Sequence, residues 1–334
     1  MEQEKKLSQL TNIRALAIFM VVLGHSIILY SSEWSLYDTS FSVPFLDVLK
    51  KIIDIPQMLL FFSLSGYLFV FTHRKNRGFV QLLKNKALRL LVPYLGIGLC
   101  FMLPIRVVVG YPTYQGIGIP DVMQKFLTAT DVGHLWFLPA LFSVFLLSDL
   151  ILTIAEHIPG VKKYPEIFLC IMAFALYLEG YRIGFGYPPL LSAFNYLLWF
   201  SLGYTANIWQ DTVKKIYAIA PVKWALIVLN LVLIGYSAVA GSMRVLLSLL
   251  MKGLCVINAY GVIPGKSCRI VEKIDRNSFG VYLFHSPLIY ITYATIPDAN
   301  PVLVVFLNLV VFGALAYGVT ELVRKTKFKV LLGD

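Results

Sequence analysis

The stretch IRALAIFMVVLGHSIILY, residues 13–30, contains one charged side chain, Arg14, and one histidine, His25. An α-helix of this length rises about 27 Å, close to the roughly 30 Å thickness of a bilayer's hydrocarbon core. Similar apolar runs recur along the 334-residue chain, which is 58% hydrophobic and 14% charged, with a mean hydropathy of +0.75. These values exclude a water-soluble domain and indicate a membrane protein. Because the runs are not alternating ten-residue segments, we expect an all-α protein rather than a β-barrel.

Apolar runs bounded by Pro, Gly and charged residues predict about ten transmembrane helices. Lys and Arg gather in the segments that these spans place on one side, so we expect both termini in the cytoplasm. We also expect residues 1–334 to form one transmembrane domain without a separate soluble domain, in a multi-pass protein of the inner or plasma membrane that contacts lipids. The predicted spans are 13–31, 52–72, 88–105, 134–154, 165–180, 191–209, 222–240, 243–263, 278–296 and 301–322.

The basic composition, with a pI of about 9.4, follows mostly from this sidedness. Nucleic-acid binding needs an exposed domain that carries a basic face, and the predicted spans leave no room for one. We therefore expect no nucleic-acid partner. The four cysteines form no CxxC pattern, and we expect no bound metal.

Arg14 and His25 lie eleven residues apart in the first predicted span. In an α-helix this spacing turns both side chains to within about 20° of one direction, about 16 Å apart along the axis. An ionisable group near the bilayer centre costs roughly 2.5 kcal/mol or more and usually faces an interior cavity. Two interpretations remain open: a functional pair, or an arginine that reaches lipid phosphates and a histidine that bonds a neighbouring helix.

Further polar residues occur where the membrane makes them costly. Lys86 and Arg89 stand three residues apart at the start of the third span, where they suit a phosphate group of a ligand or of an acidic lipid. His134 and Trp136 begin the fourth span at the predicted outer surface. Besides a role in binding a ligand, a histidine that simply faces water and a tryptophan of the interfacial aromatic belt would both be common at this depth. His285, in the ninth span, approaches the predicted depth of His25.

Other polar residues have local explanations. Ser63, Ser65 and Gly66 in the second span favour close helix packing, and no GxSxG motif marks a serine nucleophile. Asp54 and Asp149 pair either with a histidine or with solvent, and the sequence does not decide between them.

Five motifs, in this order and with this predicted sidedness, resemble the acyltransferase-3 family of membrane O-acyltransferases, including its branch of fucose-4-O-acetylase-like and capsule or exopolysaccharide acetylases. The likeness covers nearly the whole chain. The motifs are TNIRALAIFMVVLGHS (11–26), FFSLSGYLF (61–69), KNKALRLLVPYL (84–95), GHLWFLPALF (133–142) and SFGVYLFHSPL (278–288).

The resemblance implies an enzyme that moves an acetyl group from cytoplasmic acetyl-CoA to a hydroxyl group of a cell-surface or lipid-linked glycan. It assigns catalysis to His25 and Arg14, and donor binding to Lys86, Arg89 and Arg14. The family's RxxR pair begins with lysine here, which keeps the charge but loses the planar bidentate fork. Donor binding is therefore expected to be weaker or to be shared with Arg74 or Arg77. For the acceptor we expect His134, Trp136 and His285.

Some alternatives stay open at this stage. Succinyl transfer fits the same residues, and so does a transporter or flippase for a lipid-linked sugar or small anion, because buried His and Arg also build ion paths. A non-catalytic subunit with the same fold is a further rival. Some family members carry a fused extracytoplasmic domain, and since the chain stops at Asp334 without one, it is expected to act alone, with a separate partner protein or as a homo-oligomer.

Overall fold

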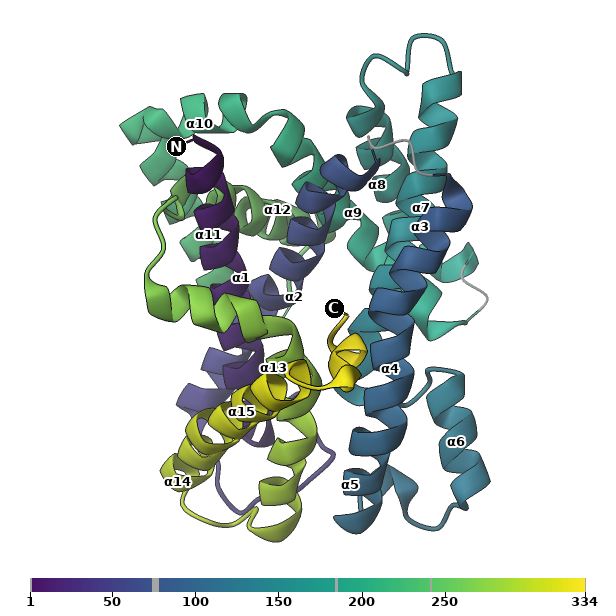
Figure 1. Cartoon of the computed structure of the whole chain (residues 1–334). Coiled ribbons are helices and arrows are strands. Elements are labelled where there is room, and N and C mark those ends of the chain that lie inside the picture. Colours follow the sequence, from purple (N-terminus) through teal and green to yellow (C-terminus); the bar gives the residue numbers. More distant parts are fainter. Residues whose placement is uncertain (1, 74–77, 184–185, 241, 334) are drawn as a thin grey trace. The chain divides into compact units, whose positions relative to one another are not determined.

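The computed structural model describes residues 2–73, 78–183, 186–240 and 242–333. These residues are largely helical and contain no β-strand, which confirms the all-α prediction (Figure 1). They form two compact units, and five helices contribute residues to both: α1 (Glu2–Ile27), α2 (Pro44–His73), α3 (Phe79–Lys86), α7 (Phe137–His157) and α13 (Arg269–Thr295). Unit 1 comprises Met1–Ala17, Ile55–Lys84 and Ala140–Asp275, and unit 2 comprises Ile18–Asp54, Asn85–Pro139 and Arg276–Asp334.

Unit 1 is held together by close helix contacts at small residues. A Cβ atom on Gly66 of α2 would lie 1.9 Å from the carbonyl oxygen of Phe200, and one on Gly203 would lie 1.8 Å from that of Ser63. The predicted small-residue packing is therefore confirmed. Besides the parts of α1, α2 and α13, the unit contains most of α3 and most of α7, together with α8 (Pro165–Ile183), α9 (Pro188–Ile208), α10 (Gln210–Ala218), α11 (Ala220–Ala240) and α12 (Val245–Val262).

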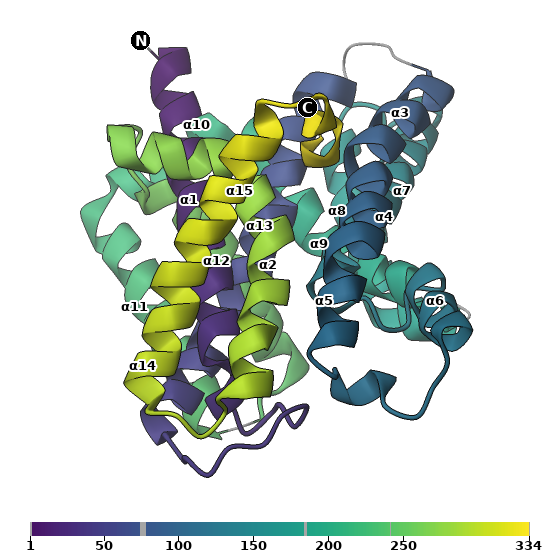
Figure 2. The same cartoon turned by 60° about the horizontal axis from the view of Figure 1, so that its bottom comes forward.

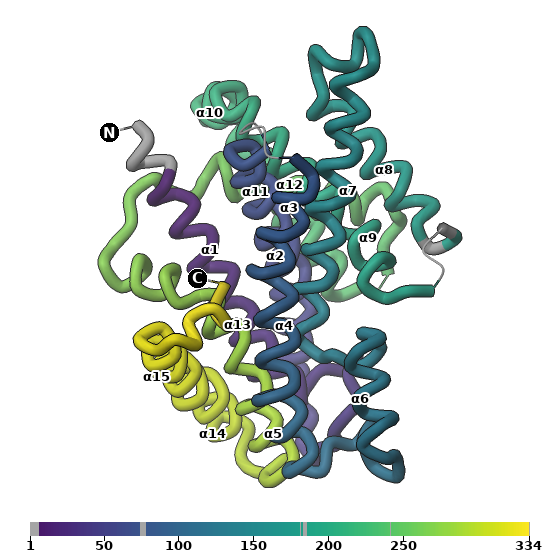
Figure 3. The backbone as a smooth tube through the Cα atoms, turned by 45° about the vertical axis from the view of Figure 1, so that its right-hand side comes forward, coloured from purple at the N-terminus to yellow at the C-terminus, as the bar shows by residue number. Residues whose placement is uncertain are grey.

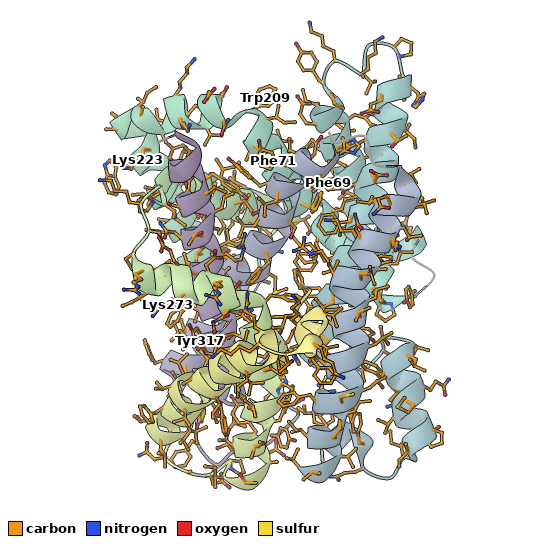
Figure 4. The ribbon with its side chains drawn as sticks, in the orientation of Figure 1. Phe69, Phe71, Trp209, Lys223, Lys273 and Tyr317 are labelled. Carbon is orange, nitrogen blue, oxygen red and sulfur yellow. The ribbon has the colours of Figure 1, made fainter. Side chains whose placement is uncertain are left out.

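Aromatic rings fill the space between α2, α7 and α9 in this unit. The ring of Phe69, labelled in Figure 4, lies 5.4 Å from that of Phe145 and 5.6 Å from that of Phe200, centroid to centroid. Nearby, the indole nitrogen of Trp209 donates a hydrogen bond of 3.1 Å to the carboxylate of Glu166. Such a partner is expected, because a partly buried indole N–H needs an acceptor.

Unit 2 is built around the second part of α13, with the last helices of the chain along it (Figure 2). Thr292 donates a hydrogen bond of 2.5 Å to Asn308, and a Cβ atom on Gly280 would lie 2.2 Å from the side chain of Thr320. The unit also contains η1 (Ile28–Tyr30), η2 (Ala87–Leu91), α4 (Val92–Ile97), η3 (Gly98–Met102), α5 (Leu103–Val108), η4 (Pro112–Tyr114), α6 (Ile119–Leu127), η5 (Gly133–Trp136), α14 (Pro301–Phe306), η6 (Leu307–Phe312), α15 (Gly313–Arg324) and η7 (Lys327–Leu332).

The segment Phe79–Val108 is one continuous helix that contains two π-helical turns, η2 and η3 (Figure 3). Each π turn contains the residue four positions before a proline: Arg89 precedes Pro93, and Cys100 precedes Pro104. Proline lacks an N–H group and its ring clashes with the carbonyl four residues earlier, so the helix loosens there. The two prolines thus explain both π turns without breaking the helix.

Seven helical segments of the described residues are long and apolar enough to cross a membrane. Helices also occupy the three other predicted spans, as α8, α9 and α13, but the count of ten is not confirmed and stays a prediction. The predicted start at residue 88 is wrong as a helix boundary, because the helix already begins at Phe79. An apolar run shows where the membrane core begins, whereas a helix continues through charged residues beyond it.

Candidate functional site

Three histidines from distant parts of the chain meet within unit 2. His25 lies in the last turn of α1, His134 in η5 and His285 in α13. The ring centroid of His285 lies 5.0 Å from that of His25 and 5.6 Å from that of His134. His285 and His134 are buried, while His25 is half-buried and keeps part of its side chain accessible. We call these three residues the histidine cluster.

Hydrogen bonds assign the nitrogen atoms of two members. Nδ1 of His25 lies 2.8 Å from the carbonyl oxygen of Val21, and Nδ1 of His285 lies 2.9 Å from the carbonyl oxygens of both Val281 and Tyr282. Because a carbonyl oxygen only accepts, both Nδ1 atoms carry hydrogen. The lone pair on Nε2 of His285 then accepts from Nδ1–H of His25 at 3.4 Å. Neutral His25 therefore carries its own lone pair on Nε2.

His134 has the opposite arrangement. Its Nε2–H donates to the carbonyl oxygen of Leu283 at 3.1 Å, so the lone pair of the neutral ring is on Nδ1. Among the described residues this buried Nδ1 has no hydrogen-bond partner. The side chain is 5% exposed, so the water-facing alternative for this histidine is wrong. The unused acceptor suits a hydroxyl group of a ligand.

Two tyrosines fix the backbone around the histidine cluster. The hydroxyl of Tyr293 donates to the carbonyl oxygen of His25 at 2.5 Å, and that of Tyr282 donates to the carbonyl oxygen of His134. Both tyrosines belong to α13, which also carries His285. One helix therefore positions all three histidines, directly or through a hydroxyl group.

Arg14 belongs to unit 1, where its partner is a carboxylate that sequence reasoning did not identify. The guanidinium lies 2.9 Å from Asp275, which also accepts a hydrogen bond of 3.0 Å from Thr11. The Arg14 side chain is 31% exposed, so the ion pair holds it in place without enclosing it. The role predicted for Arg14 in donor binding and catalysis stays a prediction.

Lys86 and Arg89 belong to unit 2, with Lys86 half-buried and Arg89 exposed. Lys86 ends α3, and Arg89 lies in the π turn η2, where each residue turns less about the axis than in an α-helix. Their binding of phosphate stays a prediction, and Arg74 and Arg77 lie outside the described residues.

The other residues singled out in the sequence have common packing or ion-pair partners. Trp136 is half-buried beside Phe137, with ring centroids 6.4 Å apart, and its acceptor role stays a prediction. Asp149 pairs with a histidine, since its carboxylate lies 3.3 Å from Nδ1 of His73, whereas Asp54 pairs with Lys50. No group of His, Cys, Asp and Glu side chains within the described part of the chain is arranged to hold a metal ion.

Sequence reasoning missed the fully buried charge of Arg106 in unit 2. Its side chain is fully buried and paired with Asp131 at 3.2 Å. The signal available in the sequence was its position at the end of an apolar run, followed within eight residues by Tyr111 and Tyr114. Arginine commonly stacks on aromatic rings, so such a spacing favours a buried contact.

Comparison with known proteins gives one match. A family model described as an acyltransferase domain, that of the acyltransferase-3 family, matches residues 7–320, which include the histidine cluster and parts of both units. Neither a curated protein nor a solved structure matches the chain.

Proposed function

Because the chain belongs to the acyltransferase-3 family, we propose that it transfers an acetyl group from acetyl-CoA to a hydroxyl group of a cell-surface or lipid-linked glycan. The family match and the apolar helices make it a multi-pass membrane acyltransferase that uses an acyl donor and an acceptor. The resemblance of the five motifs supports acetyl-CoA as the donor and a sugar as the acceptor. It also supports the inner or plasma membrane as the location.

The observation that carries the catalytic part is the 2.8 Å contact between Nδ1 of His25 and the carbonyl oxygen of Val21, from which we infer that the lone pair of the neutral ring is on Nε2. In the proposed reaction this nitrogen takes the proton of the acceptor hydroxyl while the oxygen attacks the thioester carbonyl. A C–O bond forms, the C–S bond breaks, and the imidazolium returns the proton to the leaving thiolate. General-base catalysis of this kind contributes about 10²–10⁴ in rate. A two-step route through an acetylated His25 uses the same nitrogen.

We propose that the other two histidines act on the acceptor side. His285 accepts the Nδ1–H of His25 and so keeps that ring in one tautomer. Nδ1 of His134, which has no hydrogen-bond partner within the described ranges, receives a hydrogen bond from a sugar hydroxyl, which orients the acceptor. Trp136 offers a ring face to the same sugar.

We propose that the cationic side chains Lys86, Arg89 and Arg14 bind the phosphates of the donor, which the motif resemblance supports. Lys86 and Arg89 are in the same compact unit as His25. The proposal for Arg14 rests on its position in α1, eleven residues before His25.

The test compares His25→Ala with His157→Ala, a control at an exposed histidine of the same chain. Surface glycans from cells that carry each variant are analysed by mass spectrometry, and the amount of folded protein is measured in parallel. We expect O-acetyl groups to be lost only with His25→Ala. Undiminished acetylation by folded His25→Ala protein would refute the role of this residue.

A second measurement separates the enzyme from its rivals. Acetyl-CoA at about 100 times its dissociation constant should stabilise the purified enzyme by about 2.7 kcal/mol. A flippase for a lipid-linked sugar, or a non-catalytic subunit, predicts no such stabilisation. Succinyl-CoA in the same assay tests the alternative donor, and stronger stabilisation by it would replace acetyl by succinyl transfer.

A further inference from the structure

Arg106 of α5 is a buried cation with unused hydrogen-bonding capacity. Its side chain is 0% exposed, and its Nη1 donates to the hydroxyl of Tyr114 and the carboxylate of Asp131, both at 3.2 Å. Nε and Nη2 of Arg106 and Oδ2 of Asp131 have no hydrogen-bond partner among the described residues. Because buried polar atoms are costly when unpaired, these three atoms point to a ligand.

Aromatic rings surround this ion pair. The guanidinium carbon of Arg106 lies 4.1 Å from the ring centroid of Tyr111 and 5.4 Å from that of Tyr290. The ring of Tyr37 lies 6.1 Å from that of Tyr290, and its hydroxyl is buried without a partner among the described groups. These rings form what we call the aromatic cluster: Trp34, Tyr37, Tyr111, Tyr114, Tyr290 and Tyr293.

The aromatic cluster adjoins the histidine cluster in unit 2. Tyr293 belongs to it and donates its hydroxyl to the carbonyl oxygen of His25. A Cβ atom on Gly133 would lie 2.0 Å from Nη2 of Arg106, so the guanidinium packs against the residue directly before His134. A ligand bound at Arg106 therefore lies beside the backbone that carries His134 of the histidine cluster.

We propose that Arg106, Asp131 and the aromatic cluster bind the sugar ring of the acceptor, and that this ring is a neutral pyranose with adjacent hydroxyl groups. One hydroxyl accepts from Nε and Nη2 of Arg106, and its neighbour donates to Oδ2 of Asp131. The apolar C–H face of the ring packs on tyrosine rings, as apolar ligand surfaces do in aromatic-lined sites.

The charge balance selects a neutral sugar over an acidic one. Asp131 already compensates the charge of Arg106, so the carboxylate of a uronic acid would add an uncompensated charge to a buried site. The half-buried members, Trp34 and Tyr37, come from the irregular segment 31–43 and form the accessible edge of the cluster. This inference rests on the proposed function, because it assigns the acceptor of the same reaction.

The test uses the purified full-length protein in lipid nanodiscs with radiolabelled acetyl-CoA. The acceptor probes are methyl glycosides of neutral hexoses in the pyranose form. Each is compared with the methyl glycoside of the matching uronic acid, which carries a free carboxylate. We expect transfer to at least one neutral pyranoside and less transfer to its uronate. Wild-type protein that transfers acetyl to no sugar would refute the proposed function itself, whereas preference for a uronate would overturn only this inference.

Two variants test the residues. Arg106→Gln should raise the KM for the pyranoside at least tenfold and leave the KM for acetyl-CoA within twofold of wild type. Arg106→Lys should not restore the pyranoside KM, because an ammonium group lacks the planar fork of a guanidinium. Since loss of a buried arginine can also impair folding, Tyr37→Phe provides a milder change: it removes only a hydroxyl group that bonds to no other described residue. Tyr37→Phe should raise the acceptor KM several-fold without lowering the melting temperature.

The control is Arg244→Gln at an exposed arginine of unit 1, which should change neither KM. A purely structural role of the cluster predicts that both Arg106→Gln and Tyr37→Phe leave the acceptor KM of the folded fraction unchanged. That result would overturn the inference even if the proposed acetyl transfer stands.

Discussion

Replacing His285 by alanine should slow acyl transfer far less than replacing His25. The structure gives His285 one contact with the reacting ring, a hydrogen bond of 3.4 Å from Nδ1–H of His25, while the carbonyl oxygen of Val21 holds the same hydrogen at 2.8 Å. Losing the weaker of these two contacts should cost about 0.5–1.5 kcal/mol, or roughly a 2- to 13-fold fall in kcat. Losing the base itself should cost about 10²–10⁴-fold.

The assay is acetyl transfer from radiolabelled acetyl-CoA by purified protein, with wild-type, His25→Ala, His285→Ala and His157→Ala measured at equal amounts of folded protein. His157 is exposed and bonded only within its own helix, so its replacement controls for the loss of an imidazole. If folded His285→Ala loses as much activity as His25→Ala, His285 itself contacts the reacting groups, and the assignment of the base to Nε2 of His25 is refuted.

Three further predictions concern stability. Gly66→Ala should lower the free energy of unfolding by about 1–3 kcal/mol or more, because the new Cβ atom would lie 1.9 Å from a backbone carbonyl oxygen. Gly235→Ala, whose new Cβ atom would have nothing within 4 Å, should raise it by about 0.8–1.0 kcal/mol, and melting temperatures in detergent compare the two variants. Asp275→Ala should cost about 1.5–3 kcal/mol through the lost bond to Arg14, and Arg14→Ala should add little to that loss; full additivity in the double variant would contradict the pairing. Burial raises the pKa of Tyr217 to about 12. Since an unfolded tyrosine ionises near pH 10, stability should fall between about pH 10 and 12. The difference in absorbance between wild type and Tyr217→Phe isolates the ionisation of this one hydroxyl group, and it should show no tyrosinate below about pH 11. Ionisation of Tyr217 near pH 10 would contradict its burial.

The sequence was sufficient for the features that the bilayer imposes. Apolar length predicted helices throughout, and the cost of ionisable groups in lipid drew attention to His25 and His285. It could not predict that these two rings touch, because they lie 260 positions apart and depth along a helix says nothing about which faces meet. The tautomer of His25 was equally hidden, since it depends on the carbonyl of Val21 and on which nitrogen reaches it.

Arg106 shows why counting charges is not enough in a membrane protein. By sidedness it is one more basic residue near the outer surface, where an exposed arginine costs little. The structure instead buries it completely, with a single carboxylate, Asp131, to compensate it. Packing alone does not require this arrangement, because an apolar side chain of similar volume would avoid the desolvation penalty of both charges. A guanidinium and a carboxylate oxygen kept without full partners, next to the histidine cluster, are explained when a polar ligand completes their hydrogen bonds.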